Sequence, residues 1–213
     1  MEMIILKVEE IFFRDIYKQI CLLKNRGLAK KFADLFDNEP VDGLLTYGYI
    51  DAAAGFTFSI LGGAMTSGGK IKIFPINYNA AAIVRRSGAD GADLKIVTAE
   101  YALPFRDRMQ MIDDAYFVDD AKEQTRFIKN LDAFRHPHYP DDVAVYFFSA
   151  EHKPELLWVR CQSVDENILT GELLNEPTKD FGCHAGDKIL FGVAQLGEQN
   201  ILIHLPNKED SLA

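Results

Sequence analysis

The stretch 134–191 reads FRHPHYPDDVAVYFFSAEHKPELLWVRCQSVDENILTGELLNEPTKDFGCHAGDKILF, and it decides the fold expected for the C-terminal part of the chain. Three runs in it are rich in aliphatic and aromatic residues: 143–149, 156–161 and 187–194. Runs of this length that are bounded by Pro, Gly, Asp and Asn are typical of β-strands. A fourth run, 168–174, has Gly171 in its interior, which indicates a bulge or a close approach of two backbones. The four runs predict an antiparallel meander that can close into a small barrel, with Trp158 in its core.

Rigid and tightly turning segments connect these runs. The prolines Pro137 and Pro140 fix φ and hold the entry to the first run in extended conformations. The segment 165–167, DEN, fits a hairpin turn because Asn tolerates positive φ. Gly186 and Asp187 precede the last run, and they fit a tight turn in which the carboxylate accepts hydrogen bonds from backbone amides.

The same meander resembles a small bacterial family of unknown function, the YegJ-like proteins. The resemblance lies in an E-x-x-W-V strand, a G-x-L-x-N-x-P segment and a G-D-x-I/V strand start, and it covers about a quarter of the chain. The matching residues are Glu155, Trp158, Val159, Gly171, Leu173, Asn175, Pro177, Gly186, Asp187 and Ile189. The chain departs from the family pattern after the last run, where GEQNILIHL stands in place of an I/V-x-D-W ending. The resemblance implies a bacterial protein, and it transfers no catalytic residue because the family carries no established activity.

The N-terminal half is expected to combine helices with strands. Apolar residues at helical spacing predict an amphipathic helix over 8–23, which Gly27 ends, and a second helix over 28–36. A further helix is expected over 120–134, where Asp120 and Glu123 form a capping box. Strands are predicted at 44–50, 56–61, 70–76, 81–85 and 94–101.

Helices and strands do not alternate along the chain as βαβ units, so a doubly wound parallel sheet is not expected. The sequence predicts an α+β fold in which N-terminal helices cover a largely antiparallel sheet and a C-terminal β meander or small barrel follows. Residues 1–134 are expected to form an N-terminal α+β region and residues 135–206 the meander, as two domains or as one continuous domain.

The charge balance is acidic. The 213 residues include 32 Asp and Glu against 23 Lys and Arg, which gives a formal net charge of -9. Binding to nucleic acid depends on neutralising phosphates with Lys and Arg, so nucleic acid is not expected as the main partner. An acidic surface is instead compatible with a basic protein partner. No cofactor is expected, and the sequence does not indicate an oligomeric state.

The cellular location is expected to be the cytoplasm. The N-terminus, MEMIILKVEE, lacks the basic region and the long apolar core of a signal peptide. No run approaches the roughly 18 apolar residues of a membrane span, so no membrane association is expected. Cys21, Cys161 and Cys183 are widely spaced without a CxxC pair, which suits a reducing compartment.

The sharpest candidate for a site is the cluster Arg135, His136, His138, Asp141 and Asp142. In His-x-His both imidazoles lie on the same side of an extended segment, and a nearby carboxylate completes a metal site, so His136, His138 and Asp141 are the candidate ligands. The alternative is a rigid loop in which these side chains bond to backbone groups between two prolines.

A second group of candidates lies further along the chain. His152 or His184 is a candidate third imidazole for the same metal site. His184 is a poor base for the neighbouring Cys183, because adjacent side chains seldom point together in an extended chain. Asn175 and Glu176 precede a proline, and they are expected either to fix a turn or to take part in surface recognition.

Three functions remain open at this point. The first is a non-enzymatic protein-binding or accessory module, comparable to an immunity protein that neutralises a toxin. The second is a metal-dependent hydrolase that uses the loop with His136, His138 and Asp141. The third is a small-ligand-binding protein with a pocket between sheet and helices. The acidic balance and the lack of a complete catalytic motif favour the first.

Overall fold

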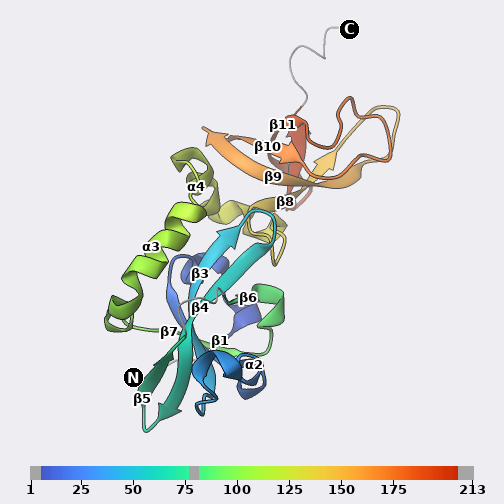
Figure 1. Cartoon of the computed structure of the whole chain (residues 1–213). Coiled ribbons are helices and arrows are strands. Elements are labelled where there is room, and N and C mark those ends of the chain that lie inside the picture. Colours follow the sequence, from blue (N-terminus) through green and yellow to red (C-terminus); the bar gives the residue numbers. More distant parts are fainter. Residues whose placement is uncertain (1–5, 77–81, 206–213) are drawn as a thin grey trace. The chain divides into compact units, whose positions relative to one another are not determined.

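The computed structural model describes residues 6–76 and 82–205 and divides the chain into two compact units, Met1–Phe117 and Val118–Ala213 (Figure 1). The division lies before helix α4 (Asp120–Arg126), whereas the sequence placed it after residue 134. The reason is that α4 packs on strand β9 (Glu155–Asp165), which belongs to the second unit.

The first unit is built on an antiparallel sheet with the strand order β1-β7-β2-β3-β4-β5, and β6 also pairs with β4. Its strands are β1 (Leu6–Lys7), β2 (Ile20–Lys24), β3 (Gly43–Asp51), β4 (Gly55–Ser67), β5 (Lys70–Pro75), β6 (Ile83–Arg85) and β7 (Asp93–Ile96). All five strands that the sequence predicts correspond to β3–β7, although residue 81 lies outside the described residues. The predicted α+β class with its antiparallel sheet is confirmed.

The long helix predicted over 8–23 is wrong. This segment forms the one-turn helices η1 (Val8–Glu10) and α1 (Phe13–Ile16), and then strand β2. The sheet places β2 between β7 and β3, and four consecutive residues of β2 are buried. A strand covered on both faces reads as a continuous apolar run without alternation, so a helical spacing can be fitted to it.

The second helix is shorter than predicted and begins earlier. It consists of α2 (Arg26–Lys30), which is followed by η2 (Ala33–Phe36). The side chain of Asn25 accepts a hydrogen bond from the backbone N–H of Leu28 at 3.0 Å and so caps the first turn. Gly27 therefore lies inside α2 and does not end the preceding element.

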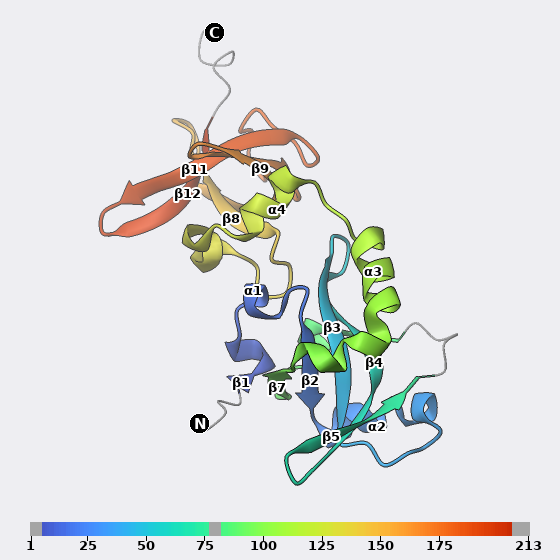
Figure 2. The ribbon, with the colours of Figure 1, turned by 90° about the vertical axis from the view of Figure 1, so that its left-hand side faces the viewer.

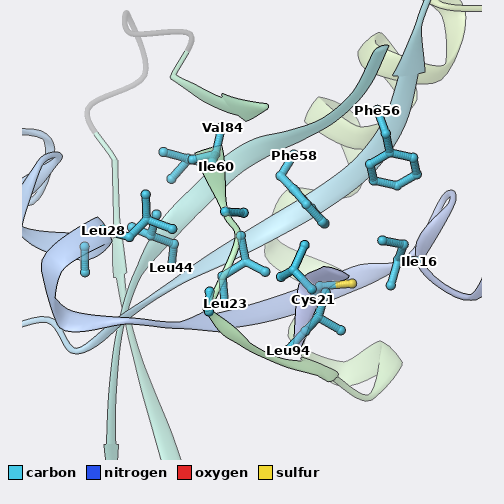
Figure 3. Close-up of a cluster of buried hydrophobic side chains, with 14 of the residues drawn as sticks. Ile16, Cys21, Leu23, Leu28, Leu44, Phe56, Phe58, Ile60, Val84 and Leu94 are labelled. Atoms are coloured by element: carbon cyan, nitrogen blue, oxygen red, sulfur yellow. The ribbon is translucent and has the colours of Figure 1, made fainter. Parts of the chain in front are cut away.

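The sheet of the first unit is covered on both faces. On one face, a large apolar core packs against α1, α2 and the short helices η1 and η2 (Figure 3). On the other face lies α3 (Arg106–Ala115), which the sequence did not predict (Figure 2). There Leu45 and Tyr47 of β3 belong to a second cluster with Met109 and Ile112 of α3, and the Tyr47 hydroxyl donates to Asp113 at 2.8 Å. Side chains therefore fill the space between this face and α3.

The second unit contains a closed five-stranded barrel, as the sequence allowed. Its strands are β8 (Asp142–Phe147), β9, β10 (Ile168–Leu173), β11 (Lys188–Leu196) and β12 (Gln199–Leu205). The order is β10-β11-β12-β8-β9, and all neighbours are antiparallel except β12 and β8. The sequence did not predict β12, which closes the barrel.

Two backbone predictions inside the barrel are confirmed. The pairing of β9 with β10 shifts register at Gly171, where a Cβ atom would lie 2.5 Å from Cγ1 of Val159. Gly186 has φ 92°, and the carboxylate of Asp187 accepts a hydrogen bond from the backbone N–H of His184 at 2.7 Å. In the hairpin between β9 and β10, Glu166 carries the positive φ of 52°, in contrast to the expectation from Asn.

The helical segment predicted over 120–134 consists of two pieces. Helix α4 ends at Arg126, and η6 (Lys129–Phe134) follows. The capping residue is Asp119, whose side chain accepts a hydrogen bond from the backbone N–H of Lys122 at 2.8 Å. The cap therefore lies one residue before the predicted Asp120.

Candidate functional site

The loop before β8 folds around the ring of His136. Nδ1 of this ring accepts hydrogen bonds from the backbone N–H groups of His138 at 3.1 Å and Tyr139 at 3.2 Å. A ring nitrogen that accepts two hydrogen bonds carries no proton, so the proton of the neutral ring lies on Nε2. Burial lowers the pKa of His136, the neighbouring His138 lowers it further, and Asp142 opposes the shift. The neutral form of the His136 imidazole is therefore the one that holds the loop together.

Both carboxylates of the loop are engaged by arginines from other elements. Asp141 is 3% exposed and accepts hydrogen bonds from Nε and Nη2 of Arg126, both at 2.9 Å. Asp142 accepts from Nε of Arg160 at 2.7 Å and from Nη2 at 3.0 Å. Burial by itself raises the pKa of Asp141, but the hydrogen bonds and positive charge of Arg126 outweigh this, and the net pKa is lowered. Asp141 is therefore a buried, paired carboxylate.

Arg135 connects the loop to α4 and η6. Its Nη2 donates to the carbonyl of Thr125 at 2.6 Å, Nη1 donates to the carbonyl of Pro140, and Nε lies 3.5 Å from Asp132. Arg135 thus bonds to backbone groups on both sides of the loop. These contacts match the alternative interpretation of the cluster as a rigid loop.

The other candidate residues lie around the connection between β10 and β11. His184 pairs through Nδ1 with the carboxylate of Glu176 at 2.7 Å, and the side chain of Asn175 accepts from the backbone N–H of Trp158 at 2.8 Å. The pKa of His184 is raised by this hydrogen bond. Cys183 is buried, and burial raises the pKa of its thiol, which disfavours the thiolate that a nucleophile needs.

The structure does not assemble the proposed ligands into a metal centre. Within residues 6–76 and 82–205, no three His, Cys, Asp or Glu side chains come together in a group that could hold a metal ion. The ring of His152, which was a candidate third ligand, instead lies edge-on to Phe181 with 6.2 Å between centroids. Metal binding by His136, His138 and Asp141 stays a prediction that this geometry does not favour.

Sequence reasoning missed an apolar surface on the outside of the barrel. We call the set Tyr146, Phe148, Leu156 and Trp158 the barrel patch. Tyr146 pairs with Leu156 across β8 and β9, and the rings of Tyr146 and Phe148 lie 6.1 Å apart. Phe148 is 49% exposed, Leu156 50% and Trp158 37%. Trp158 was expected in the core, so that prediction is wrong.

Alternation along the strands explains this position. The neighbours Leu157 and Val159 are buried inside the barrel, and side chains on a strand point to opposite faces in turn, so Leu156 and Trp158 point outward. The ring of His136 lies edge-on to the indole of Trp158, with 5.1 Å between centroids. The sequence signal for the patch is the run LLWV. Its consecutive residues are all apolar, so both faces of this strand carry apolar side chains.

Comparison with protein-family models, curated proteins and solved structures found no match. The resemblance to the YegJ-like proteins therefore stays a prediction. In the part of the chain that the structure describes, no helix combines the length and the apolar character needed to cross a membrane.

The negative charge is concentrated in the unit that carries the patch. Val118–Ala213 contains 17 Asp and Glu against 9 Lys and Arg, a formal net charge of -8. Met1–Phe117 contains 15 against 14, a net charge of -1. Nearly all of the acidic balance of the chain therefore belongs to the unit that carries the barrel patch.

Proposed function

We propose that this chain is a non-enzymatic protein-binding module, comparable to an immunity protein or an accessory factor, and that the barrel patch is its binding face. The observation that carries the proposal is the contiguity of four large side chains on one surface. Isolated apolar residues are common on protein surfaces, whereas adjoining ones mark interaction sites. Aromatic residues such as Tyr146 and Trp158 are enriched in interfaces and among the residues that dominate binding energy.

The polar chemistry of the same unit supports a binding role over a catalytic one. Catalytic acids, bases and nucleophiles must present a reactive atom to substrate. Asp141 and Asp142 direct their carboxylates at arginines, and His136 directs Nδ1 at backbone amides. The two carboxylates therefore stabilise the loop with the atoms that a catalyst would use, and Nδ1 of His136 is occupied in the same way.

We further propose a cytoplasmic location in a bacterium. Support comes from Cys21, Cys161 and Cys183, which are all free thiols and all buried. Unpaired cysteines are typical of proteins that stay in a reducing compartment. The bacterial source rests on the YegJ-like resemblance.

The proposal is tested by site-specific photo-crosslinking in the host cell. A photoreactive phenylalanine analogue is placed at Leu156 in the patch or, as a matched control, at Leu196, which is 62% exposed at the end of β11. We expect a protein adduct from position 156 that is absent from position 196. The captured protein, once purified, is expected to bind the full chain and the Leu196→Ser variant equally and the Leu156→Ser variant at least about tenfold more weakly.

Two outcomes contradict the proposal. One is the absence of any adduct specific to position 156. The other is a purified adduct partner that binds Leu156→Ser as tightly as the unmodified chain, while circular dichroism shows that both variants are folded.

A further inference from the structure

The distribution of charge around the barrel patch indicates what kind of partner fits it. The patch alone, as an apolar surface, accepts many apolar surfaces, and only its surroundings discriminate among them. The surroundings belong to a unit with a formal net charge of -8. The inference below concerns the partner of the proposed binding face, and it therefore rests on the proposed function.

Carboxylates border the patch along the chain and across the strands. Glu151 lies in the connection from β8 to β9, which joins Phe148 to Leu156, although Lys153 lies there too. On β10, Glu172 pairs with Arg160, which is two residues from Trp158 and so on the same face of β9.

A third carboxylate approaches from the loop after β10. Glu176 follows Asn175, whose side chain binds the backbone N–H of Trp158 at 2.8 Å. The pKa of Glu176 is lowered by hydrogen bonds from His184 and from the backbone N–H of Ala185, so this carboxylate is ionised at neutral pH. Acidic groups thus lie beside the patch from the β8–β9 connection, from β10 and from the β10–β11 loop.

The nearest guanidinium does not offset these charges. Arg160 is neutralised by its paired hydrogen bonds with Asp142 at 2.7 and 3.0 Å. Other cations of this unit are likewise ion-paired within it: Lys122, Arg126 and Arg135. Lys188 lies opposite Glu172 on β11, and His184 pairs with Glu176. The charge that favours a basic partner is therefore the excess of carboxylates over the whole unit, a formal net charge of -8.

We propose that the partner of the barrel patch is a protein surface rich in Arg and Lys, with an aliphatic or aromatic side chain seated on the patch. Arg and Lys suit both the carboxylates of this unit and the rings of the patch. They pair with carboxylates, and they pack over the faces of aromatic rings such as those of Tyr146, Phe148 and Trp158. Like charge disfavours two other occupants. A second copy brings another unit of net charge -8, and an anionic membrane repels the same surface.

The inference is tested with a phage-displayed library of random peptides, selected on the full chain. Bound phage are counter-selected on the Leu156→Ser variant, so that only ligands that need the patch remain. We expect the surviving peptides to carry net positive charge together with at least one large apolar residue. Synthetic copies are expected to lose about tenfold in affinity on Leu156→Ser, and to bind the Leu196→Ser control like the unmodified chain.

Charge complementarity is measured separately with Glu172→Gln, which keeps the shape of the side chain and removes its charge. We expect a loss of affinity of a few-fold at low salt that disappears at high salt, since screening already removes the contribution of this carboxylate. An identical affinity at low salt for Glu172→Gln and the unmodified chain counts against the inference.

The outcomes separate the inference from the function on which it rests. Neutral or acidic peptides that depend on Leu156 overturn the basic partner and leave the binding face in place. A library without any ligand that depends on Leu156 overturns both. Sedimentation of the full chain as a dimer that Leu156→Ser dissolves, or binding to anionic vesicles that Leu156→Ser abolishes, assigns the patch to another occupant and overturns the inference.

Discussion

Replacing Arg126 with methionine is expected to destabilise the barrel unit far more than a surface substitution would. Arg126 is 1% exposed and Asp141 is 3% exposed, and two hydrogen bonds of 2.9 Å join them. Arg126→Met keeps much of the side-chain volume but leaves the Asp141 carboxylate buried. The cations that remain near it are Lys122, with Nζ at 3.5 Å, and Arg135. Breaking a buried pair in this way costs about 3–5 kcal/mol. We expect a value in the lower half of that range, because Lys122 still partly neutralises Asp141.

The cost is measured by urea unfolding at pH 7. Trp158 is the only tryptophan and lies in the second unit, so its fluorescence follows that unit. The matched control is Arg160→Met, which breaks the Arg160–Asp142 pair of similar geometry in a more exposed place, with side chains 24% and 9% exposed. We expect about 1–3 kcal/mol for the control. The Asp142 carboxylate that is left behind is buried, but Arg160 is partly exposed, so its removal admits water to that carboxylate.

Adding Asp141→Asn to Arg126→Met is expected to recover about 1–2 kcal/mol, since it removes the unpaired buried charge. The pH dependence has a definite sign. The pKa of Asp141 is lowered in the folded state, so the pair stabilises the unit above the ordinary carboxyl pKa, and the stabilisation is lost as pH falls through the folded value. An Arg126→Met cost no larger than that of Arg160→Met would refute the view that this pair is a buried structural element.

Three further predictions concern the loop, the barrel interior and metal. The pKa of His136 is lowered in the folded state, so the unfolded chain binds the proton more readily, and the free energy of unfolding is expected to fall as pH drops below about 6.5. Trp158 fluorescence measures this unfolding, because the indole lies next to the His136 ring. His136→Asn keeps an acceptor in place of Nδ1 and is expected to abolish this pH dependence. Gly171→Ala places a Cβ 2.6 Å from the carbonyl oxygen of Arg160 and is expected to lower the free energy of unfolding by about 1–3 kcal/mol. In Gly192→Ala the nearest atom to the new Cβ lies at 3.4 Å, so we expect a loss of less than about 1 kcal/mol in the same unfolding assay. Removing metal with a chelator is expected to leave the melting temperature unchanged, because Arg126 and Arg160 occupy the loop carboxylates; a drop that added metal reverses would instead support the metal site.

The barrel was easier to predict than the sheet because its strands are locally delimited. Pro140, Pro154 and Gly186 stand near the ends of apolar runs, so turn chemistry and hydrophobic pattern gave the same boundaries. Strand β2 has no such contrast, since it is buried on both faces and a helical spacing fits it equally well. Helix α3 was missed because RDRMQMIDDA has few apolar residues, and only one side of it meets the sheet.

The candidate site was predictable in composition and not in connectivity. The sequence indicated that the loop from Arg135 to Asp142 gathers charged and imidazole groups. It gave no means to find that Arg126, on α4, and Arg160, on β9, supply the opposite charges, because these contacts depend on the tertiary fold. Trp158 was misplaced for the same reason. Its neighbour Leu157 is as apolar as Leu156, and only the closure of the barrel decides which parity faces inward.

The polar residues that suggested chemistry contact the tryptophan of the barrel patch and the strand that carries it. The His136 ring lies edge-on to Trp158, and its Nδ1 holds the loop in which it sits. Asp142 holds Arg160 on the outer face of β9, two residues from Trp158. A loss of partner binding on substitution of His136 is therefore no evidence that the imidazole is catalytic or touches the partner. Leu156→Ser is expected to remove a contact with the partner without disturbing the loop. A loop variant acts by positioning the patch if it loses binding to the same partner as Leu156→Ser does and also alters Trp158 fluorescence in the free chain.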